Sequence, residues 1–474
     1  MSTSLLDGLR AVYSGRLYVD AADKAPFLTD WRGLWHGDAL AVVQPDSTEQ
    51  VAAIMRWASR TGTSVTPQGG NTGLSGGSVP ESGAQGIVLS LTRLNAIRAI
   101  DAVNGSMTVE AGCLLSQVQE AADGVDRYFP LSLAAEGSCT IGGNLATNAG
   151  GTAVLRYGNA RDLCLGLELV TADGQVWDGL RGLRKDNTGY SLRDLFIGSE
   201  GTLGIITAAV VKLFPKPAAR VAAFAGVESP EAATRLLAAM QVRAADALTA
   251  FELMSALCLD LVIDHVPGTR IPLEQRTPWY VLLEVSDATS EERATENLQE
   301  GLMSAFEDGI ILDAAIAASI AQSQDFWALR EHISEAQGSA GKTIKHDVSV
   351  PISSIARFIS EAGSALADHY PDVRPVVFGH LGDGNLHYNI SPAVGGDGAA
   401  LLERQEAINR VVHDLVVAHH GSISAEHGLG VLRRDEAAHY KAPVEIHMMK
   451  AIKTALDPDG LMNPKKVLAE TQPC

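Results

Sequence analysis

Three histidines and a glutamate stand in two short stretches late in the chain, and these residue types can bind a metal ion. The first stretch reads FGHLGDGNLHYNI, residues 378–390, and the second reads SAEHG, residues 424–428. Two histidines and a carboxylate that leave one coordination position open form a site for zinc or another divalent ion, and a substrate oxygen atom can take that position. The plainer alternative is a pair of ordinary histidines beside a tight turn.

The first stretch is predicted to form a β-hairpin. Its Asp-Gly pair lies between two apolar runs, which is the strongest short hairpin signal. With residues 382–385 as the turn, His380 lies opposite His387, and paired side chains share one face. The two imidazoles could then bind one cation, with Glu426 as a third ligand.

The size and charge of the chain narrow the classes of protein it can be. Its 474 residues predict two or three domains, and 46% hydrophobic with 20% charged residues is typical of a globular protein with several cores. The formal net charge of −19 argues against nucleic acid or an acidic membrane surface as a partner. An anionic substrate would therefore need a locally positive site.

Cysteine usage and the N-terminal sequence indicate the compartment. Five cysteines without a Cys-x-x-Cys spacing predict free thiols in a reducing environment. The N-terminus lacks a basic region followed by an apolar run, and no stretch approaches the roughly 18 apolar residues of a membrane span. We expect a cytoplasmic protein, with peripheral membrane association left open.

Two glycine-rich loops in the first half predict backbone packed closely around a ligand. The first, PQGGNTGLSGG at residues 67–77, follows a predicted β-α-β unit made of residues 39–43, 47–59 and 63–66. Its glycines expose backbone N–H groups that can bind phosphate, although it is neither a Rossmann nor a Walker loop. The second, GSCTIGGNLATNAGG at residues 137–151, mixes small residues with Asn and Thr, which suits a buried polar ligand.

The pattern changes at about residue 218 to strands and helices with longer connections. This change predicts an antiparallel sheet with helices on one side of it. One predicted helix, residues 323–337, carries Arg330 and Ser334 one turn apart and hence on one face, and Lys345 follows it. Another helix is predicted at residues 443–456.

Seven motifs in a fixed order carry a family resemblance. They are PQGGNTGLSGG, GSCTIGGNLATNAGG, RKDNTGY, GSEGTLGIIT, GHLGDGNLHYNI, SAEHGLG and MNPKKVL. Together they resemble the FAD-linked 2-hydroxyacid dehydrogenases of the vanillyl-alcohol-oxidase type, over about residues 36–470. Within that family the chain is most similar to D-2-hydroxyglutarate dehydrogenases, with D-lactate dehydrogenases and the glycolate oxidase flavin subunit as relatives.

The resemblance implies an α+β fold in two main parts. After a lead-in at residues 1–35, a two-part FAD-binding domain of the vanillyl-alcohol-oxidase type would cover residues 36–215. A cap domain, with an antiparallel sheet flanked by helices, would cover residues 216–425 and bind the substrate. Residues 426–474 would return to the flavin.

The resemblance also implies that the first glycine loop holds the FAD pyrophosphate and that the second lines the flavin. The predicted cofactor-binding residues are Pro67, Gly69, Gly70, Asn71, Thr72, Gly73, Gly76, Gly77, Gly137, Ser138, Gly142, Gly143, Asn144, Thr147, Asn148, Gly150, Gly201, Gly204, Ile206 and Asn463. Some relatives link FAD through a histidine in the first loop, where this chain has Gly-Asn-Thr. The FAD is therefore expected to be non-covalent.

The metal ligands and the catalytic base follow from the same resemblance. His380, His387 and Glu426 match the metal ligands of the family, and zinc is the expected divalent ion. His427 matches the residue beside the substrate and would act as the general base, a task that suits a histidine at neutral pH.

The remaining predicted site residues bind the substrate. Arg330 and Lys345 match residues that hold a distal carboxylate, and an arginine can engage a carboxylate through two hydrogen bonds. Asn389 matches another substrate contact. Ser334 stands where the relatives tend to have threonine, and it keeps the hydroxyl.

The implied reaction removes two electrons from a D-2-hydroxy acid. The metal would lower the pKa of the substrate hydroxyl, and carbon 2 would deliver a hydride to the flavin. A distal carboxylate favours D-2-hydroxyglutarate, oxidised to 2-oxoglutarate; dehydrogenation of D-lactate, D-malate or glycolate is the alternative.

Partners and other reaction classes are less constrained. The cysteines offer no iron–sulfur set, so electrons would leave to a separate carrier such as an electron-transfer flavoprotein or a quinone. A homodimer is left open. A non-redox enzyme of the alkyl-dihydroxyacetone-phosphate synthase type is disfavoured, because that group carries a histidine run and this chain has only His419-His420. A flavin-binding electron-transfer subunit without its own substrate is the other alternative.

Overall fold

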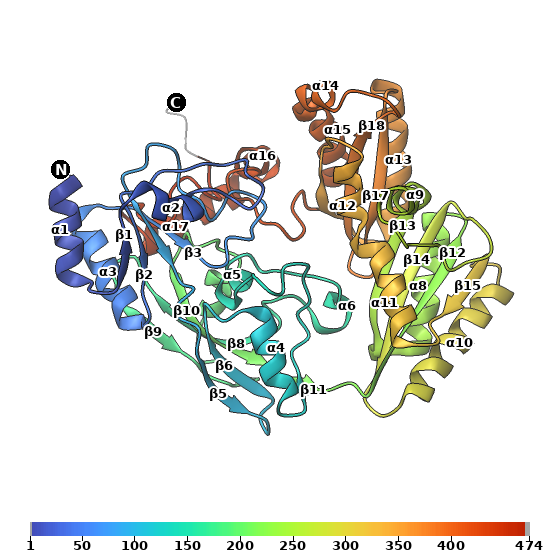
Figure 1. Ribbon diagram of the computed structural model, residues 1–474, viewed down its shortest axis with the longest axis horizontal. Coiled ribbons are helices and arrows are strands. Elements are labelled where there is room, and N and C mark those ends of the chain that lie inside the picture. The colour runs from blue at the N-terminus through green and yellow to red at the C-terminus, as the bar shows by residue number, and fades with distance from the viewer. Residues whose placement is uncertain (1, 470–474) are drawn as a thin grey trace. The chain divides into compact units, whose positions relative to one another are not determined.

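The computed structural model describes residues 2–469, and the chain divides into two compact units. Unit 1 consists of Met1–Gly151, Gly158–Pro215 and Glu426–Cys474, and unit 2 consists of Thr152–Tyr157 and Lys216–Ala425. Figure 1 shows the helices and strands of each unit.

Unit 1 begins with a four-stranded sheet in the order β1-β2-β4-β3. Strand β1 is antiparallel to β2, and the other pairs are parallel. The strands are β1 (Arg16–Tyr18), β2 (Ala41–Gln44), β3 (Val65–Gln68) and β4 (Ile87–Ser90), with helices α1 (Ser2–Val12), α2 (Ala21–Leu28) and α3 (Thr48–Thr61). The N-terminal residues therefore contribute a strand as well as helices.

The predicted β-α-β unit is confirmed as β2, α3 and β3. Ser47 caps α3, because its side chain accepts a hydrogen bond from the backbone N–H of Gln50 at 3.2 Å. Gly62 ends the helix in a left-handed conformation with φ 65°, which costs glycine little. The two strands of the unit are not neighbours, since β4 lies between them.

The second sheet of unit 1 is antiparallel, in the order β5-β6-β10-β8-β9. Its strands are β5 (Ile97–Asp101), β6 (Ser106–Glu110), β8 (Cys164–Val170), β9 (Val176–Gly179) and β10 (Ile205–Lys212). Strands β7 (Arg127–Tyr128) and β11 (Phe214–Pro215) form a separate pair. The helices of this part and of the C-terminal segment are α4 (Leu115–Asp123), α5 (Ile141–Ala146), α7 (Leu192–Phe196), α16 (Arg434–Tyr440) and α17 (Pro443–Leu456).

Unit 2 contains a seven-stranded antiparallel sheet in the order β15-β12-β14-β13-β17-β18-β16. The strands are β12 (Ala219–Val227), β13 (Leu248–Ser255), β14 (Trp279–Asp287), β15 (Asp313–Ile316), β16 (Asp347–Ser349), β17 (Val373–His380) and β18 (Asn385–Pro392). The helices are α6 (Val154–Tyr157), α8 (Pro230–Ala244), α9 (Ala256–His265), α10 (Glu291–Glu307), α11 (Ile320–Glu331), α12 (Ile333–Ser339), α13 (Ile355–His369), α14 (Gly398–Glu403) and α15 (Gln405–Ala418). This is the α+β architecture expected from the sequence.

The prediction that helices cover one side of this sheet was wrong. Alternate residues of β12 and β14, such as Phe224 and Leu282, pack with α9, α11 and α12 in one core. Their neighbours Ala223 and Leu283 point to the other face and are equally buried, where α8 and α10 pack. Strands that are buried on both faces have continuous apolar runs, so these strands lack the polar–apolar alternation that an open face would produce.

The predicted helix at residues 323–337 is two helices. Helix α11 ends at Glu331 and α12 begins at Ile333, with His332 between them. Arg330 and Ser334 therefore lie on different helices rather than one turn apart. The predicted helix at residues 443–456 is confirmed as α17.

Two further expectations concern cysteines and membranes. The four cysteines within the described residues are free and buried, and Cys474 lies outside those residues. Within residues 2–469 no helix has the length and apolar character that a membrane crossing requires.

Candidate functional site

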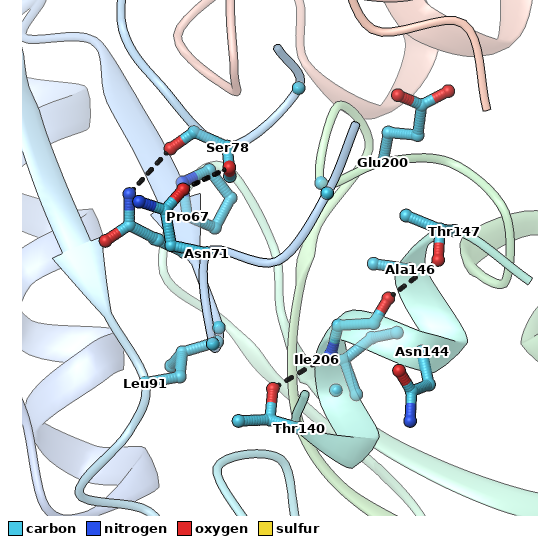
Figure 2. A pocket seen from close by; sticks show the side chains of 18 of the residues that line it. Pro67, Asn71, Ser78, Leu91, Thr140, Asn144, Ala146, Thr147, Glu200 and Ile206 are labelled. Carbon is cyan, nitrogen blue, oxygen red and sulfur yellow. Dashed lines mark hydrogen bonds between the residues drawn. The ribbon is translucent and has the colours of Figure 1, made fainter. Parts of the chain in front are cut away.

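A hollow that is partly open to solvent lies in unit 1 between the two glycine loops (Figure 2). Of the predicted cofactor-binding residues, those that line it are Pro67, Gly69, Gly70, Asn71, Thr72, Gly73, Gly77, Gly142, Gly143, Asn144, Thr147, Gly201, Gly204 and Ile206.

Close backbone approach explains the glycines of this hollow. A side chain at Gly70 would collide with the carbonyl oxygen of Ser138, and one at Gly69 would collide with the Thr140 hydroxyl. The two loops therefore touch through their backbones, and only glycine allows that contact.

Side-chain hydrogen bonds hold both loops in shape (Figure 2). Thr140 caps α5, because its hydroxyl accepts a hydrogen bond from the Gly143 N–H at 3.3 Å. Ser78 donates to the side-chain oxygen of Asn71 at 2.7 Å, and Asn71 has a left-handed φ of 54°. The polar side chains of these loops thus support the backbone that faces the hollow.

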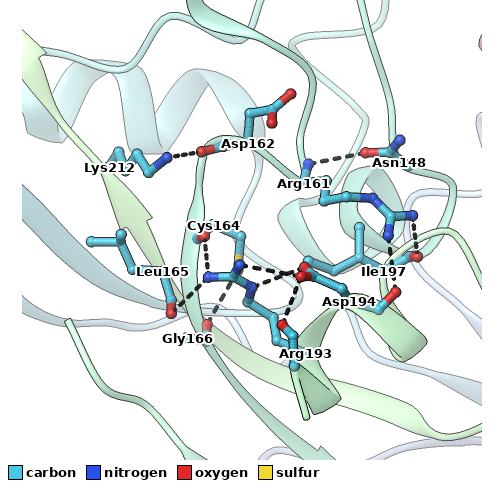
Figure 3. Close-up of polar contacts among 11 residues, drawn as sticks. Asn148, Arg161, Asp162, Cys164, Leu165, Gly166, Arg193, Asp194, Ile197 and Lys212 are labelled. Carbon is cyan, nitrogen blue, oxygen red and sulfur yellow. Dashed lines mark hydrogen bonds and ion pairs between the residues drawn. The ribbon is translucent and has the colours of Figure 1, made fainter. Parts of the chain in front are cut away.

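Six predicted cofactor residues do not line the hollow: Gly76, Gly137, Ser138, Asn148, Gly150 and Asn463. Asn463 donates hydrogen bonds to two lining residues, as described below. Asn148 contacts a residue outside the hollow, because its side-chain oxygen accepts a hydrogen bond from the Arg161 N–H at 3.0 Å (Figure 3). The Arg161 guanidinium donates in turn to the carbonyl oxygens of Asp194 and Ile197, at 2.9 and 2.8 Å. This chain of contacts joins the second glycine loop to the segment that leads into Glu200.

Glu200 also lines the hollow, although it was not among the predicted cofactor-binding residues. Its carboxylate accepts hydrogen bonds from the backbone N–H groups of Leu429 and Gly430, at 2.7 and 2.8 Å. Burial raises the pKa of Glu200 and lowers the pKa of nearby Lys466 to about 8. The glutamate in the GSEGTLG motif thus anchors the C-terminal segment of unit 1.

His427, the predicted base, lines the same hollow. Its backbone carbonyl oxygen accepts a hydrogen bond from the Ser75 hydroxyl at 2.9 Å. Ser75 belongs to the first glycine loop, so that loop positions a residue that is distant in sequence.

Asn463 provides a test of whether a polar cofactor fits. Its amide nitrogen donates to the carbonyl oxygens of Gly77 and Glu200, at 2.9 and 2.8 Å. Its side-chain oxygen is buried and has no hydrogen-bond partner among the residues that the structure describes. A buried orphan acceptor beside a glycine-lined hollow suits a ligand that donates hydrogen bonds, as FAD does.

The histidine hairpin of unit 2 forms, but its predicted register was wrong by two residues. Phe378 pairs with His387, whereas His380 pairs with Glu252 of the neighbouring strand β13. Phe378 and His387 are the last pair of the hairpin, so more residues lie between its paired residues than the four predicted turn residues. Gly379, with φ 153°, is one of them. A shift of two residues keeps each side chain on its face, because the period of a strand is two.

The two histidines consequently still lie side by side. Their ring centroids are 6.0 Å apart, and each offers a ring nitrogen within 4.8 Å of the other. Phe378 packs against His387 with ring centroids 4.8 Å apart.

A buried network surrounds His380. Its Nδ1 atom lies 2.6 Å from one carboxylate oxygen of Glu252, and Arg330 Nε donates to the other at 2.7 Å. Desolvation opposes the charge on Glu252, but His380 and Arg330 more than offset it and lower the pKa of Glu252 to about 2. Because Nδ1 is engaged, Nε2 is the atom through which His380 would ligate a metal, and histidine ligands commonly donate their other N–H to a carboxylate.

Glu252 and Asp347 of unit 2 lie beside the predicted site residues but were not predicted from the sequence motifs. A lone glutamate inside the apolar run LTAFELM was a usable signal for the first, since buried charges are rarely unpaired. Asp347 is buried, pairs with His387 across β16 and β18, and accepts a hydrogen bond from Asn385 at 2.9 Å.

The predicted substrate residues of unit 2 have different environments. Arg330 is 9% exposed, and its terminal guanidinium nitrogens have no hydrogen-bond partner in the described part of the chain. Ser334 and Lys345 are exposed. Asn389 is buried and uses its amide to contact the His346 N–H at 3.1 Å and Gln337 at 2.8 Å. Its role as a substrate contact stays a prediction.

Glu426, the third predicted metal ligand, is half-buried and is the first residue of the last segment of unit 1. His380 and His387 belong to unit 2. Shared ligation by the three residues therefore stays a prediction.

Two family models together match most of the chain. Residues 39–179 match the FAD binding domain model, and residues 216–467 match the model for the C-terminal domain of FAD linked oxidases. The second match includes the whole seven-stranded sheet of unit 2.

Two relatives that this chain matches over most of its length are D-2-hydroxyglutarate dehydrogenases. The mitochondrial D-2-hydroxyglutarate dehydrogenase of Arabidopsis thaliana is 40% identical over 440 residues, which is 93% of this chain and 77% of the relative. The D-2-hydroxyglutarate dehydrogenase of Stutzerimonas stutzeri is 38% identical over 469 residues, 98% of this chain and 99% of the relative.

Solved structures share the fold at low identity. p-Cresol methylhydroxylase with substrate bound has a TM-score of 0.75 at 16% identity, covering 98% of this chain and 96% of that one. Alkyldihydroxyacetonephosphate synthase has a TM-score of 0.72 at 16% identity, covering 98% and 85%. The chain belongs to the FAD-linked oxidases, in the family of the D-2-hydroxyglutarate dehydrogenases.

Proposed function

We propose that this protein oxidises D-2-hydroxyglutarate to 2-oxoglutarate with FAD as the hydride acceptor. The names of these two relatives support the substrate. The observation that carries it in this chain is Arg330, a nearly buried guanidinium in a protein of net charge −19. A buried cation with unpaired terminal nitrogens suits a carboxylate ligand, which it can bind through two hydrogen bonds.

D-2-hydroxyglutarate has a distal carboxylate that a monocarboxylic hydroxy acid lacks, and this group needs its own binding residues. Arg330 and Lys345 would hold the distal carboxylate, Arg330 through its fixed fork and Lys345 as a point charge. Ser334 and Asn389 would supply further hydrogen bonds. This division predicts that D-malate binds less well, because its distal carboxylate is one carbon closer, and that D-lactate and glycolate leave the distal groups unused.

Proton removal is the task of His427. It lines the FAD hollow, and its backbone is held by Ser75 at 2.9 Å. A positioned histidine is a suitable general base for a hydroxyl proton near neutral pH. Glu200, through the neighbouring Leu429 and Gly430 amides, limits the movement of this segment.

A divalent metal, with zinc the expected ion, would be held by His380, His387 and Glu426 and would lower the pKa of the substrate hydroxyl. The Glu252 contact at Nδ1 of His380 supports this assignment. Electrons would pass from the reduced protein to a separate carrier such as an electron-transfer flavoprotein or a quinone.

The test is anaerobic bleaching of the FAD-loaded protein by a panel of hydroxy acids, before and after treatment with a chelator. We expect rapid bleaching by D-2-hydroxyglutarate, slower bleaching by D-malate, D-lactate and glycolate, none by L-2-hydroxyglutarate, and loss of bleaching when the metal is removed. Faster bleaching by D-lactate than by D-2-hydroxyglutarate would reassign the substrate. No bleaching by any hydroxy acid would favour a flavin subunit without its own substrate.

A further inference from the structure

Glu252 is the most deeply buried acidic group of unit 2. Its side chain has no exposed surface, and its two oxygens receive hydrogen bonds from two different partners. His380 comes from the directly paired position of strand β17, and Arg330 comes from the end of helix α11. One carboxylate thus joins a predicted metal ligand to a predicted substrate residue.

An ordinary core role does not account for this arrangement. Removing charged groups from water is costly, and well-packed apolar residues usually serve stability as well or better. The surrounding face of the sheet is apolar, with Met254 and Phe378 on the same side. A buried trio of ionisable side chains in such surroundings is typical of a functional site.

The geometry fixes both partners. The carboxylate accepts at 2.6 Å from His380, which places the proton on Nδ1 and directs Nε2 away from Glu252. It accepts at 2.7 Å from Arg330 Nε, so the terminal nitrogens of the guanidinium point elsewhere. The guanidinium carbon lies 4.9 Å from the ring centroid of Phe378, which supports it from one face.

We propose that Glu252 is a positioning residue that orients His380 for metal binding and Arg330 for the distal carboxylate of the substrate. The proposal rests on the proposed function, because it gives Glu252 its role through the metal and the substrate. It adds a residue outside the motifs and makes the two binding groups depend on one carboxylate.

Glu252→Gln is the informative change. An amide has one acceptor oxygen and one donor nitrogen, so it can satisfy His380 or Arg330 but presents an N–H group to the other. Glu252→Asp keeps both acceptor oxygens on a side chain shorter by one carbon. Glu284→Gln is the matched control, since Glu284 lies on β14 of the same sheet and accepts a hydrogen bond from Thr249 instead.

The main measurement is zinc affinity, which does not depend on turnover. The FAD-loaded protein is stripped of metal, and zinc is titrated against a chromophoric chelator. We expect Glu252→Gln to bind zinc about 10–100-fold more weakly, the usual effect of losing such a partner of a ligand. Glu252→Asp should fall between Glu252→Gln and the wild type, and Glu284→Gln should match the wild type.

A second measurement addresses the arginine. At saturating zinc, KM for D-2-hydroxyglutarate should rise more in Glu252→Gln than KM for D-lactate, because only the first substrate uses Arg330. Thermal unfolding and the FAD content of each variant check that both units remain folded. If Glu252→Gln does not fold, the same comparison is made with Glu252→Asp.

The outcomes separate the two claims. Zinc affinity of Glu252→Gln equal to wild type, while His380→Ala loses zinc, would overturn the positioning role and leave the proposed function intact. A Glu252→Gln variant that loses thermal stability, but keeps the wild-type zinc affinity and the wild-type ratio of KM for D-2-hydroxyglutarate to KM for D-lactate, would likewise show that Glu252 forms a purely structural ion pair. Turnover and zinc binding that survive in His380→Ala would instead remove the metal site on which both claims rest.

Discussion

The Ser75 hydroxyl donates a hydrogen bond to the backbone carbonyl oxygen of His427, 2.9 Å away. The backbone of Ser75 is used as well, since its carbonyl oxygen accepts from the Val431 N–H at 2.9 Å. The first glycine loop therefore holds the segment that carries the predicted base through two atoms of Ser75, its hydroxyl and its carbonyl oxygen.

Ser75→Ala should lower kcat with little loss of FAD. The substitution removes one hydrogen bond, worth about 1 kcal/mol, from the position of His427. We expect kcat to fall about fivefold and KM to change less, because the base is displaced while the substrate-binding residues stay. Steady-state kinetics and the flavin absorbance measure this, with exposed Ser82→Ala as the control. Unchanged kcat would mean that the other contacts suffice.

His380→Ala should abolish turnover while FAD stays bound. The FAD hollow lies in unit 1 and His380 in unit 2, so losing the imidazole removes a metal ligand without touching the cofactor pocket. The matched control is His369→Ala, an exposed histidine at the end of α13. Full activity of His380→Ala after treatment with a chelator would dispose of the metal hypothesis.

Arg330→Ala should raise KM for D-2-hydroxyglutarate far more than for D-lactate. A hydrogen-bonded charge is worth about 1.5–3 kcal/mol, so we expect a rise of about 10–100-fold for the dicarboxylate. Arg404→Ala is the control, because this arginine pairs with Asp372 at the surface of the same unit. Equal effects on both substrates would remove Arg330 from distal recognition.

Gly70→Ala should lose FAD, and Gly137→Ala should keep it. The added methyl group at Gly70 meets the Ser138 carbonyl oxygen, whereas nothing lies within 4 Å of the corresponding position at Gly137. Both glycines were predicted to bind the cofactor, so the ratio of flavin to protein absorbance tests the structure against the motif. FAD loss in both variants would bring Gly137 back to the pocket.

The buried Lys466 predicts a pH-dependent stability. Burial lowers its pKa to about 8, against an ordinary value of 10.5 in the unfolded chain. Between these values the unfolded chain binds the proton and the folded protein does not, so stability rises with pH across this window. Since one pKa unit corresponds to about 1.36 kcal/mol, the rise is on the order of 3 kcal/mol at most.

Lys466→Met isolates this contribution, because methionine cannot titrate. The free energy of unfolding of the wild type, minus that of Lys466→Met, should increase from pH 8 to pH 10 in denaturant titrations of the FAD-loaded protein. A difference that stays flat over this range would show that Lys466 titrates at its ordinary pKa.

The sequence predicted the hairpin and its faces but not its register. An Asp-Gly pair signals a tight turn, and that signal is local. In the structure Phe378 and His387 form the last pair of the hairpin, so the connection between its paired residues is longer than the four turn residues that the Asp-Gly signal suggested. An Asp-Gly pair does not specify how many residues the connection contains, whereas the faces survive because the slip is even.

The same distinction explains the other differences. The capped helix α3 followed from Ser47 and Gly62, whose effects are local. The break at His332 did not, because no glycine or proline marks it. Glu252 was missed because its importance comes from partners in β17 and α11, brought together only by the folded sheet.

The last segment of unit 1 also closes the edge of its first sheet. Met462 forms a parallel bridge with Val65 of β3, whose N–H donates to the Leu461 carbonyl oxygen at 2.8 Å. During synthesis on the ribosome the edge strand β3 stays without this partner until the segment around Met462 has emerged. FAD would then bind late in folding. A chain that ended before this segment would leave β3 as an unpaired edge strand, which promotes aggregation.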